Sequence, residues 1–484
     1  MTERASHGRG KKIFLVHPLG ANWVPGEKDM SRLANIMPPI GLCSLAAWLD
    51  RHGHRAVIHD CYAHALGDEA LLRRLREEAP DFLGISATTS SFLDGMRLAQ
   101  LAKSARPGLK VIVGGVHVSA LRERLLREFP VIDYGIAGEG EMTLLELLEH
   151  GDDGLEEIQG LIHRDGGAGG EVIFNGPRVP HGDLDAFPFP AYEKLAGYPA
   201  SYKLPLFSYP RSPGTTAISS RGCPYTCSYC DRSVFGRSFG FHSAEYMFEL
   251  TRHLRRRFGI RHINFYDDLF TLKRERIAEY CERLLRGGLK MSFNCAARAE
   301  HLDAELLRLM KRAGCWMISL GIETGDPELL RRHRPTTRLE LIRERMALIR
   351  RTGIRAKGLF IMGLPGETEA SIDQSLRFVL DMPMDDFNLT KFTPFPGSPL
   401  YRDLARHGHF EEQWELMNCL NFVFVPEGLT LGRLEQRYRE FYRRYYERPK
   451  VLLGYVAMLW RAPDSWRRFL ANLGDFLKLR KDFK

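Results

Sequence analysis

The first 150 residues alternate two hydrophobic patterns along the chain. Short runs of β-branched and other apolar residues predict strands, and longer stretches with an apolar residue every three or four positions predict helices. Strands are expected at Lys12–Val16, Ala56–His59, Phe82–Ser86, Lys110–Val113 and Val131–Ile136, and helices at Gly41–Arg51, Glu69–Glu78, Leu93–Ser104, Ser119–Glu128 and Glu141–His150. This alternation predicts an N-terminal doubly wound parallel sheet.

A second strand–helix series follows in the middle of the chain. Its strands are expected at Thr216–Ser220, His262–Asp267, Ser292–Ala296, Trp316–Ile322, Ala356–Met362 and Phe387–Phe392. Six such units predict a partial (β/α)6 TIM-like barrel with its chemistry at the carboxyl ends of the strands. We therefore expect an α/β protein divided into a sheet domain (1–150), a linker with a hairpin (151–210), the barrel (211–400) and a C-terminal helical region in which the strand–helix repeat does not continue (401–484).

Composition narrows the class of protein. The chain has 484 residues, of which 44% are hydrophobic and 27% charged, as in a globular protein with a sizeable core. Its nine cysteines, an odd number with one tight cluster, indicate a reduced cytoplasmic protein rather than a disulfide framework. Residues 1–10 are polar, so no signal peptide is expected, and no apolar run is long enough for a transmembrane helix.

Charge leaves several partners open. The formal charge of +9 permits nucleic acid, phosphorylated substrates or lipid head groups without selecting among them. Near the C-terminus, Val451–Trp460 is apolar and 466–484 mixes aromatic and basic residues, a composition that basic membrane-surface helices share. We favour a helix packed over the barrel, with peripheral membrane contact as the alternative. The basic run Arg331–Arg334 is expected at the surface.

Three cysteines carry the clearest chemical signal. Cys223, Cys227 and Cys230 are spaced C-x3-C-x2-C directly after the first predicted barrel strand. Thiolate-only ligation favours zinc or an iron–sulfur cluster. A structural zinc ion needs four closed ligands, and the chain has no second C-x-x-C pair, so His242 would have to complete a Cys3His site. A [4Fe–4S] cluster held by three cysteines instead keeps one iron open.

The cysteine motif resembles that of the radical S-adenosylmethionine (radical SAM) superfamily, in which the residue before the third cysteine is typically aromatic, as Tyr229 is here. Groups that follow the later barrel strands resemble the SAM-binding elements of the same family. The resemblance implies that SAM occupies the open iron and is bound by Tyr229, by Asp267 and Asp268 at its amino group, by Arg298 and Glu323 at its carboxylate or ribose, and by the Ile361–Pro365 stretch, with Ile361 and Gly363, beside its adenine.

The N-terminal loops resemble the cobalamin-binding domain that is joined to many radical SAM enzymes. The similarity rests on Met37–Leu42, Gly114–His117 and Gly138–Glu141, and it implies cobalamin contacts from Thr88, Ser90, Gly114, Gly115, His117, Gly138, Glu139 and Gly140. The D-x-H-x-x-G pattern that supplies an axial histidine in mutase-type domains is missing, because His17–Asn22 follows the first strand. The resemblance therefore implies cobalamin without a protein histidine below the cobalt, and neither His17 nor His117 is expected to be a metal ligand.

The resemblance implies an enzyme with a [4Fe–4S] cluster, SAM and cobalamin that reductively cleaves SAM to a 5′-deoxyadenosyl radical. We expect C-methylation of an unactivated carbon, with an anaerobic oxidative cyclase acting on a tetrapyrrole-like or lipid substrate as the alternative. A tRNA methylthiotransferase is disfavoured, because the N-terminal domain holds only Cys43 and Cys61. A corrinoid sensor or a zinc-stabilised nucleic-acid binder remains as a non-enzymatic class.

The expected partners follow from this function. They are a small-molecule substrate, for which a hydrophobic compound is one option, and an electron donor of the flavodoxin or ferredoxin type. No nucleic-acid partner is expected.

Overall fold

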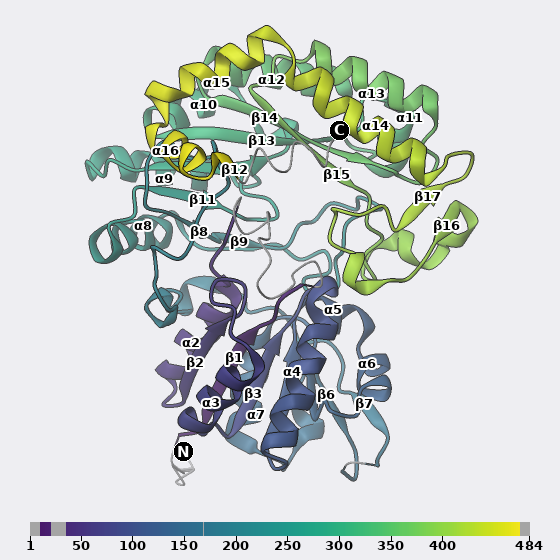
Figure 1. Ribbon diagram of the computed structural model, residues 1–484. Helices are drawn as coiled ribbons and strands as arrows, with labels where there is room; N and C mark the ends of the chain where they lie inside the picture. Colours follow the sequence, from purple (N-terminus) through teal and green to yellow (C-terminus); the bar gives the residue numbers. More distant parts are fainter. Residues whose placement is uncertain (1–9, 21–34, 168, 475–484) are drawn as a thin grey trace. The chain divides into compact units, whose positions relative to one another are not determined.

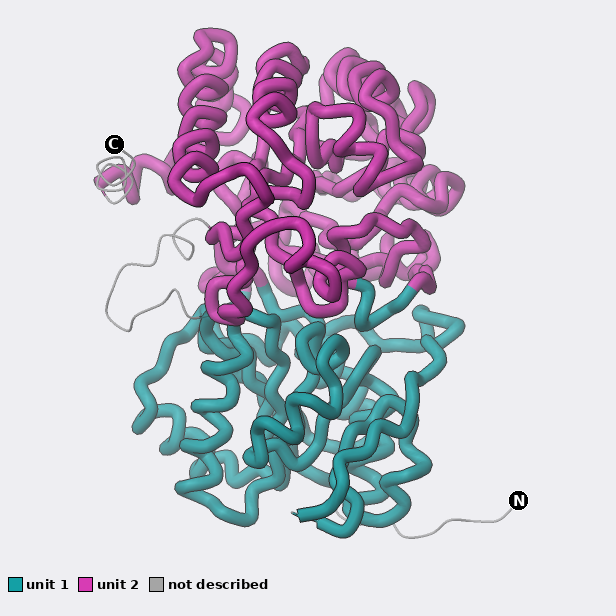
Figure 2. The backbone as a smooth tube through the Cα atoms, turned by 90° about the vertical axis from the view of Figure 1, so that its right-hand side faces the viewer, with its two compact units in different colours: residues 1–29, 38–198, 232–236 teal, residues 30–37, 199–231, 237–484 magenta. Residues whose placement is uncertain are grey.

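A computed structural model describes residues 10–20, 35–167 and 169–474. The chain divides into two compact units, which Figure 2 shows in different colours. Unit 1 comprises residues 1–29, 38–198 and 232–236, and unit 2 comprises 30–37, 199–231 and 237–484. Three parts of the sequence-based predictions lie outside the described residues. They are residues 1–9, where no signal peptide is expected, residues 475–484 at the end of the basic tail, and Ala21 and Asn22 of the loop after the first strand.

Unit 1 is built on a seven-stranded sheet in the order β2-β1-β3-β4-β5-β6-β7. The parallel strands are β1 (Lys12–His17), β2 (Arg55–Asp60), β3 (Phe82–Ser86), β4 (Lys110–Gly114) and β5 (Tyr134–Ile136), followed by antiparallel β6 (Leu161–Arg164) and β7 (Val172–Phe174). Their apolar runs are buried, as both faces of such a sheet require. The doubly wound parallel sheet predicted from the sequence is confirmed.

Helices cover this sheet, with α2 packed against β1 and β2, α4 against β3, and α5 against β4 (Figure 1). Their bounds are α2 (Ile40–Arg51), α3 (Asp68–Glu78), α4 (Phe92–Ala105), α5 (Val116–Leu121), α6 (Glu123–Glu128) and α7 (Gly140–His150), with short 3-10 turns η1 (Thr89–Ser91), η2 (Leu155–Glu157), η3 (Leu184–Ala186) and η4 (Tyr192–Lys194). The single helix predicted at Ser119–Glu128 is wrong. Arg122 takes a φ of +47°, which ends α5 and starts α6.

The hairpin predicted in the linker is part of unit 1. Strand β6 pairs with β5 through Gly135 and Ile162, so β6 and β7 continue the sheet beyond the expected boundary at residue 150. Unit 1 accordingly extends to Tyr198. Residues 401–484, expected as a separate region, belong to unit 2 together with the barrel strands.

Unit 2 contains a six-stranded parallel sheet in the order β15-β14-β13-β12-β11-β8. Its strands are β8 (Gly214–Ala217), β11 (His262–Phe265), β12 (Ser292–Ala297), β13 (Cys315–Glu323), β14 (Arg355–Met362) and β15 (Asp386–Lys391). Each strand pairs with the next along the chain, so the predicted partial barrel is confirmed. A short ribbon of β9 (Ser220–Arg221) and β10 (Gly240–Phe241) flanks the cysteine motif.

Four of the six barrel helices begin at a residue whose side chain satisfies a backbone N–H of the first turn. The helices are α8 (Ala244–Phe258), α9 (Arg274–Arg286), α10 (Ala304–Arg312), α11 (Pro327–His333), α12 (Leu339–Arg351) and α13 (Glu369–Asp381), with η5 (Ala299–His301) before α10. The side chains of Ser243, Asp303, Asp326 and Thr368 cap α8, α10, α11 and α13 by accepting a backbone N–H three residues on. These caps fix where each helix leaves its strand loop.

The C-terminal part of unit 2 contains both helices and strands. It comprises η6 (Pro399–Arg406), β16 (Gly408–Phe410), η7 (Trp414–Leu416), β17 (Phe424–Pro426), α14 (Leu431–Tyr446), α15 (Pro449–Arg461) and α16 (Pro463–Ala471). The antiparallel pair β16–β17 lies in the stretch that the sequence predicted as helical, and this pair was not predicted. Among the described residues, none of the helices combines the length and apolarity that crossing a bilayer requires.

Candidate functional site

Cys223, Cys227 and Cys230 lie on the loop between β9 and β10, beyond the carboxyl end of β8. Cys223 and Cys227 are half-buried and Cys230 is exposed. Burial raises the pKa of the Cys223 thiol, so this thiol stays protonated until a metal displaces its proton. All three cysteines therefore lie on one short loop, and none of them is fully buried.

The surroundings of the cysteine loop bear on the two metal sites that the sequence left open. Three thiols that share one zinc ion converge on it at about 2.3 Å each. Within the described ranges, no group of three or more His, Cys, Asp or Glu side chains is placed to surround one metal ion. The ring of His242, the fourth ligand of the zinc alternative, stacks on Tyr246 at 3.8 Å. Three thiols on one loop fit an iron–sulfur cluster, in which each thiol binds a different iron.

The cysteine loop is fastened on two sides. The Ser228 backbone N–H donates to the His333 carbonyl at 3.1 Å, and the Ser228 hydroxyl lies 2.7 Å from His333 Nδ1. On the other side, the Gly397 N–H donates to Asp231 Oδ2 at 3.1 Å. A Cβ at Gly397 would lie 2.2 Å from Asp231 Oδ1, so only glycine permits this approach. The loop is thus held by protein contacts that do not involve its sulfurs.

The two aspartates after β11 have different surroundings. Asp267 is buried, and its oxygens accept hydrogen bonds from the Ser219 N–H at 2.7 Å, the Ser219 hydroxyl at 2.5 Å and the Ser220 hydroxyl at 2.7 Å. Asp268 is exposed and accepts from the Gly222 N–H at 3.0 Å. Asp267 therefore holds the strand that leads into the cysteine loop, whereas Asp268 is an exposed carboxylate near Cys223.

Arg298, which follows β12, connects the cysteine loop with the chain after α11. Its Nη2 donates to the hydroxyls of Thr336 and Thr337, both at 2.8 Å, and its Nη1 lies 3.9 Å from Cys227 Sγ. The guanidinium also stacks over the Tyr225 ring at 3.6 Å. Arg298 is 6% exposed, so these contacts fix a cation next to one of the three thiols.

Glu323, the last residue of β13, is held in a strained conformation. Its φ is +70°, which non-glycine residues rarely adopt and which concentrates at functional sites. Arg334 Nη1 donates to Glu323 Oε1 at 2.8 Å and to the Gly321 carbonyl at 2.6 Å. Burial raises the pKa of Glu323, whereas Arg334 and a hydrogen bond from Tyr229 act in the opposite direction. Tyr229 of the cysteine motif thus reaches the end of β13.

The expectation that Arg334 lies at the surface is wrong. Arg334 is only 3% exposed, whereas Arg331 and Arg332 are exposed. Leu330 and His333 are buried on the same side of α11, and Arg334 follows Leu330 by four positions, so helical periodicity would have placed it with them. Thr336, Thr337 and Tyr225 were also missed, because their contacts with Arg298 join segments far apart in the sequence.

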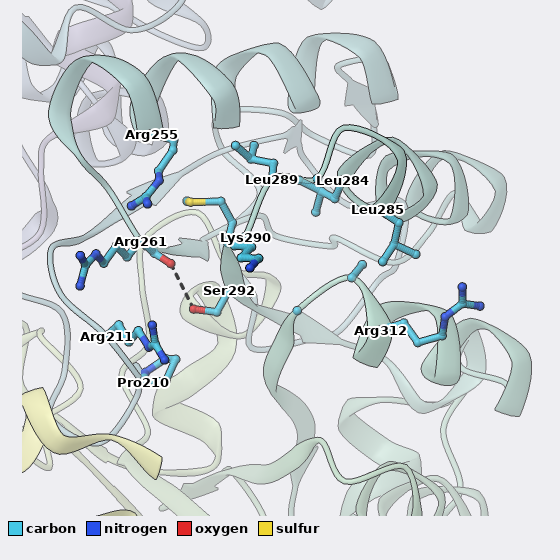
Figure 3. Close-up of a pocket in the computed structure, with 14 residues that line it drawn as sticks. Pro210, Arg211, Arg255, Arg261, Leu284, Leu285, Leu289, Lys290, Ser292 and Arg312 are labelled. Carbon is cyan, nitrogen blue, oxygen red and sulfur yellow. Dashed lines mark hydrogen bonds between the residues drawn. The ribbon is translucent and has the colours of Figure 1, made fainter. Parts of the chain in front are cut away.

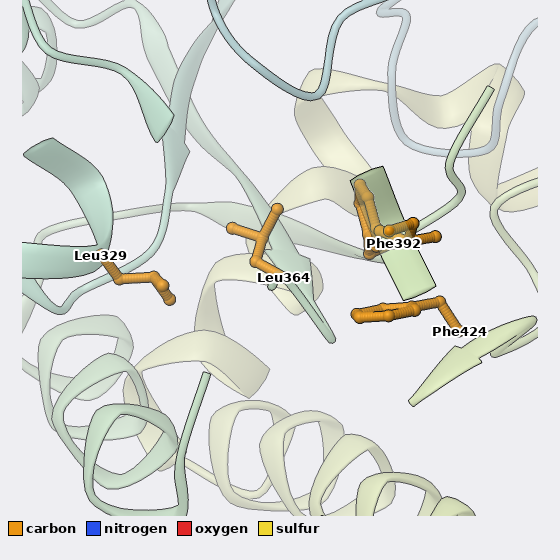
Figure 4. Packing of buried hydrophobic residues seen from close by; sticks show 5 residues of the cluster. Leu329, Leu364, Phe392 and Phe424 are labelled. Carbon is orange, nitrogen blue, oxygen red and sulfur yellow. The ribbon is translucent and has the colours of Figure 1, made fainter. Parts of the chain in front are cut away.

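Ile361 and Tyr229 pack against one hydrophobic cluster, which consists of Leu329, Leu364, Phe392, Leu404 and Phe424 (Figure 4). The residue Gly363 follows β14 with a φ of +91°, and its N–H donates to Oε2 of the buried Glu367 side chain. A Cβ at Gly363 would lie 3.3 Å from the Phe422 ring. Tyr229 of the cysteine motif and Ile361 of β14 therefore contact the same hydrophobic cluster.

In unit 1, the strand order places the topological switch point of the sheet at the carboxyl ends of β1 and β3. Strands β2 and β4 continue the sheet in opposite directions from these two, which makes this the switch point where doubly wound sheets bind ligands. Thr88 and Ser90 follow β3, where the Thr88 N–H donates to Ser91 Oγ at 3.0 Å. A Cβ at Gly20, after β1, would lie 3.9 Å from Ser90.

The other predicted cobalamin-side residues lie on the next two loops. Gly115 has a φ of +106°, and a Cβ there would lie 2.5 Å from the Ala87 carbonyl oxygen, so this position requires glycine. Gly114 ends β4 beside it. His117 is fully buried, with its ring 4.6 Å from that of Phe92. Its side chain therefore supports the loop from within the protein.

The loop after β5 is tied to the loop after β4. Gly138 has a φ of +88°, and its N–H donates to the Ser119 hydroxyl at 3.0 Å, while that hydroxyl donates to the Gly115 carbonyl at 2.9 Å. Glu139 and Gly140 start helix α7. Sequence analysis missed Ser119, whose contacts span both glycine loops.

One cavity lies at the opposite end of the barrel strands from the cysteine loop. It has a volume of about 570 Å³ and is lined near the amino ends of β11, β12 and β13 (Figure 3). Its charged lining residues are all basic: Arg211, Arg255, Arg261, Lys290 and Arg312. None of the residues predicted to bind a cofactor lines it, so it is separate from the site at the strand carboxyl ends.

Comparison with known proteins defines the class. Residues 217–379 match the radical SAM superfamily and residues 28–148 match the B12 binding domain. An uncharacterized methyltransferase of Pyrococcus horikoshii is 30% identical over 447 residues, covering 91% of this chain and 94% of that protein. The chain belongs to the radical SAM enzymes that carry a B12-binding domain.

Two further comparisons extend this result. An anaerobic magnesium-protoporphyrin IX monomethyl ester cyclase of Cereibacter sphaeroides is 28% identical over 483 residues, which cover 96% of this chain and 75% of that protein. The solved structure of the cobalamin-dependent S-adenosylmethionine radical enzyme OxsB superimposes with a TM-score of 0.74 at 17% identity, covering 98% of this chain and 75% of that one. The fold of the whole described chain is thus that of a known cobalamin-dependent radical SAM enzyme.

Proposed function

We propose that the protein methylates an unactivated carbon of a small molecule, using a [4Fe–4S] cluster, SAM and cobalamin. The observation that carries this proposal is the similarity to a methyltransferase along nearly the whole chain, including both family domains. When bound, these groups supply the one-electron reductive cleavage of SAM and the transfer of its methyl group. The protein binds and orients them and keeps water away.

The proposed cluster ligands are Cys223, Cys227 and Cys230. Arg298 Nη1 lies 3.9 Å from Cys227 Sγ, which places a cation beside one of the proposed ligands. Ser228 and Asp231 fix the loop between these cysteines and the rest of unit 2.

The proposed SAM contacts surround this loop. Asp268 offers a carboxylate for the amino group, and Arg298 offers a cation for the carboxylate. Glu323 is oriented towards the site by Arg334, and Ile361 and Gly363 form an apolar edge suited to adenine. The three internal hydrogen bonds of Asp267 give it the role of holding the strand, and Tyr229 joins the loop to Glu323.

The proposed cobalamin contacts come from three loops of unit 1. Thr88 and Ser90 offer hydroxyls, and the glycines at 114, 115, 138 and 140 let the backbone approach a large flat ligand closely. Glu139 lies between two of these glycines at the start of α7. His117 acts from beneath the loop.

The test is anaerobic reconstitution of the full chain with iron, sulfide and cobalamin, followed by mass spectrometry. We expect SAM to yield both 5′-deoxyadenosine and S-adenosylhomocysteine once a substrate is supplied. Cys227→Ala is expected to lose about four irons per chain and all 5′-deoxyadenosine, whereas Cys419→Ala, which lies outside the motif, keeps both. Protein that stays iron-free after every reconstitution contradicts the proposal.

An oxidative cyclase is the second candidate, favoured by the 28% identity to the magnesium-protoporphyrin ester cyclase. SAM with a labelled methyl group distinguishes the two, because methylation moves the label into the product and cyclisation does not. A product without label, formed together with 5′-deoxyadenosine, supports the cyclase.

The remaining partners are proposed from the chemistry. Cleavage of SAM consumes an electron, so a flavodoxin- or ferredoxin-type protein is the proposed donor, and the cytoplasm is the proposed location. The proposed substrate is hydrophobic and reaches the enzyme from a membrane surface. No nucleic-acid partner is proposed.

A further inference from the structure

Helix α15 is apolar on most of its circumference, but only one side is buried. Val451 and Met458 are 5% and 3% exposed and pack on the rest of unit 2. The opposite side, which we call the α15 outer face, consists of Leu452, Leu453, Val456, Leu459 and Trp460, with exposed fractions of 52, 67, 46, 40 and 78%. A helix that is apolar all round is normally enclosed by protein. The outer face therefore needs an explanation.

The exposure is not the result of a loosely attached helix. The Tyr455 hydroxyl donates to Asp386 Oδ1 at 3.1 Å, and the Trp466 indole N–H donates to the Tyr455 carbonyl at 3.1 Å. The Tyr455 ring also meets Phe207 edge-on at 5.2 Å. Figure 1 shows α15, in yellow, at the periphery of unit 2 beside α14 and α16. The inner side is thus anchored by specific contacts while the outer face remains uncovered by the described residues.

The exposed residues form one strip. They lie at positions i, i+1, i+4, i+7 and i+8 of the helix, which share one side of a helix with 3.6 residues per turn. Single exposed apolar side chains are ordinary, but contiguous ones mark an interaction surface. A tryptophan at the end of such a strip is typical of helices that lie at a membrane interface.

The charges around the strip indicate the partner. Lys450 and Arg461, at the two ends of α15, are exposed and form no ion pair within the described chain. Residues 448–474 carry one acidic residue, Asp464, against five basic ones: Arg448, Lys450, Arg461, Arg467 and Arg468. A second copy of the chain placed on this face would bring like charges together. A surface with negative charges above an apolar interior would cover the apolar strip and pair with its cations.

We propose that the α15 outer face binds the surface of a bilayer that contains anionic lipids. The helix lies in the plane of the interface, with its apolar strip among the acyl chains and Lys450 and Arg461 at the head groups. At 13 residues it is too short to span a bilayer. This membrane contact would give the enzyme access to a hydrophobic substrate. Only that purpose rests on the proposed function.

The experiment is cosedimentation of the purified full chain with vesicles, without SAM or substrate. Vesicles of phosphatidylcholine alone are compared with vesicles of equal parts phosphatidylcholine and phosphatidylglycerol. We expect binding to the mixed vesicles, which Leu453→Ser combined with Trp460→Ser weakens at least about tenfold. Lys450→Glu combined with Arg461→Glu is expected to remove the preference for phosphatidylglycerol. Val179→Ser, which changes a residue of unit 1 that is also 78% exposed, is the matched control and leaves binding unchanged.

Three outcomes overturn the inference. The first is wild-type protein that binds neither vesicle. The second is a dimer in solution that the Leu453 and Trp460 substitutions dissociate, because a second copy then covers the face. The third is binding that is lost on removal of residues 475–484 but kept in the α15 variants. Since no step requires turnover, failure here leaves methyl transfer untouched, and circular dichroism of each variant verifies that it is folded.

Discussion

Replacing Arg334 by methionine tests whether the Glu323–Arg334 pair holds the end of β13. The substitution keeps most of the side-chain volume and removes the only cation that contacts Glu323 among the described residues. Glu323 then keeps its φ of +70° and its buried position but loses the partner that offsets its charge. We expect a folded but clearly less stable protein.

The burial of the pair sets the magnitude. The side chains of Arg334 and Glu323 are 4% and 13% exposed, and their N and O atoms are 2.8 Å apart. Removing one partner of a buried pair typically costs about 3–5 kcal/mol, because the other charge is left uncompensated. In a unit of this size, that loss lowers the midpoint of thermal unfolding by roughly 6–20 °C. Arg406→Met removes an exposed pair with Asp403 and is expected to cost about 1 kcal/mol or less.

The assay is differential scanning calorimetry of the cluster-free protein, with both variants and wild type measured in parallel. Adding Glu323→Gln to the Arg334→Met variant removes the unpaired charge, so it is expected to recover most of the lost stability. A midpoint within about 2 °C of wild type for Arg334→Met, or no recovery in the double variant, would falsify the assignment of a buried ion pair.

Three further predictions follow from the described contacts. Gly321→Ala places a Cβ 2.7 Å from both Arg334 Nη1 and Glu323 Oε1, so it is expected to lower the thermal midpoint, and to do so less in the Arg334→Met background. Burial raises the pKa of Glu367 to about 8, so the folded protein holds a proton that the unfolded chain releases near pH 4.5. The free energy of unfolding of the wild type is therefore expected to fall as the pH rises from 5 to 8. Relative to wild type, Glu367→Gln is expected to gain about 3–4 kcal/mol of this free energy across that interval, as measured by urea titrations. Equal pH slopes for the two proteins contradict the raised pKa. Ser243→Ala removes the cap of α8 and is expected to cost about 1 kcal/mol in the same titrations.

Sequence patterns predicted the elements whose buried faces give a regular pattern of apolar residues along the chain. β3 runs from Phe82 to Ser86 as expected, because a strand buried on both faces is a continuous apolar run. The three-residue strands β16 and β17 were missed, since so few residues show no alternation. The break between α5 and α6 was missed because Arg122 carries no sequence signal for a positive φ.

The candidate site likewise contains residues that the sequence predicted and contacts that it did not. The three cysteines were identified from their spacing, which is a local property of the chain. The hydrogen bonds of Asp267 with Ser219 and Ser220, and those of Arg298 with Thr336, join residues between 38 and 48 positions apart. Such contacts depend on the packing of the barrel, so residue type and neighbours along the chain do not determine them.

His333 has a consequence for how the cysteine loop is prepared for its cluster. Its Nε2 lies 2.9 Å from the Pro365 carbonyl, which only accepts, so Nε2 carries the hydrogen and Nδ1 accepts from the Ser228 hydroxyl. A single tautomer thus fastens the cysteine loop to the segment after β14. The loop is ordered before any iron arrives, which reduces the conformational entropy that cluster assembly has to overcome.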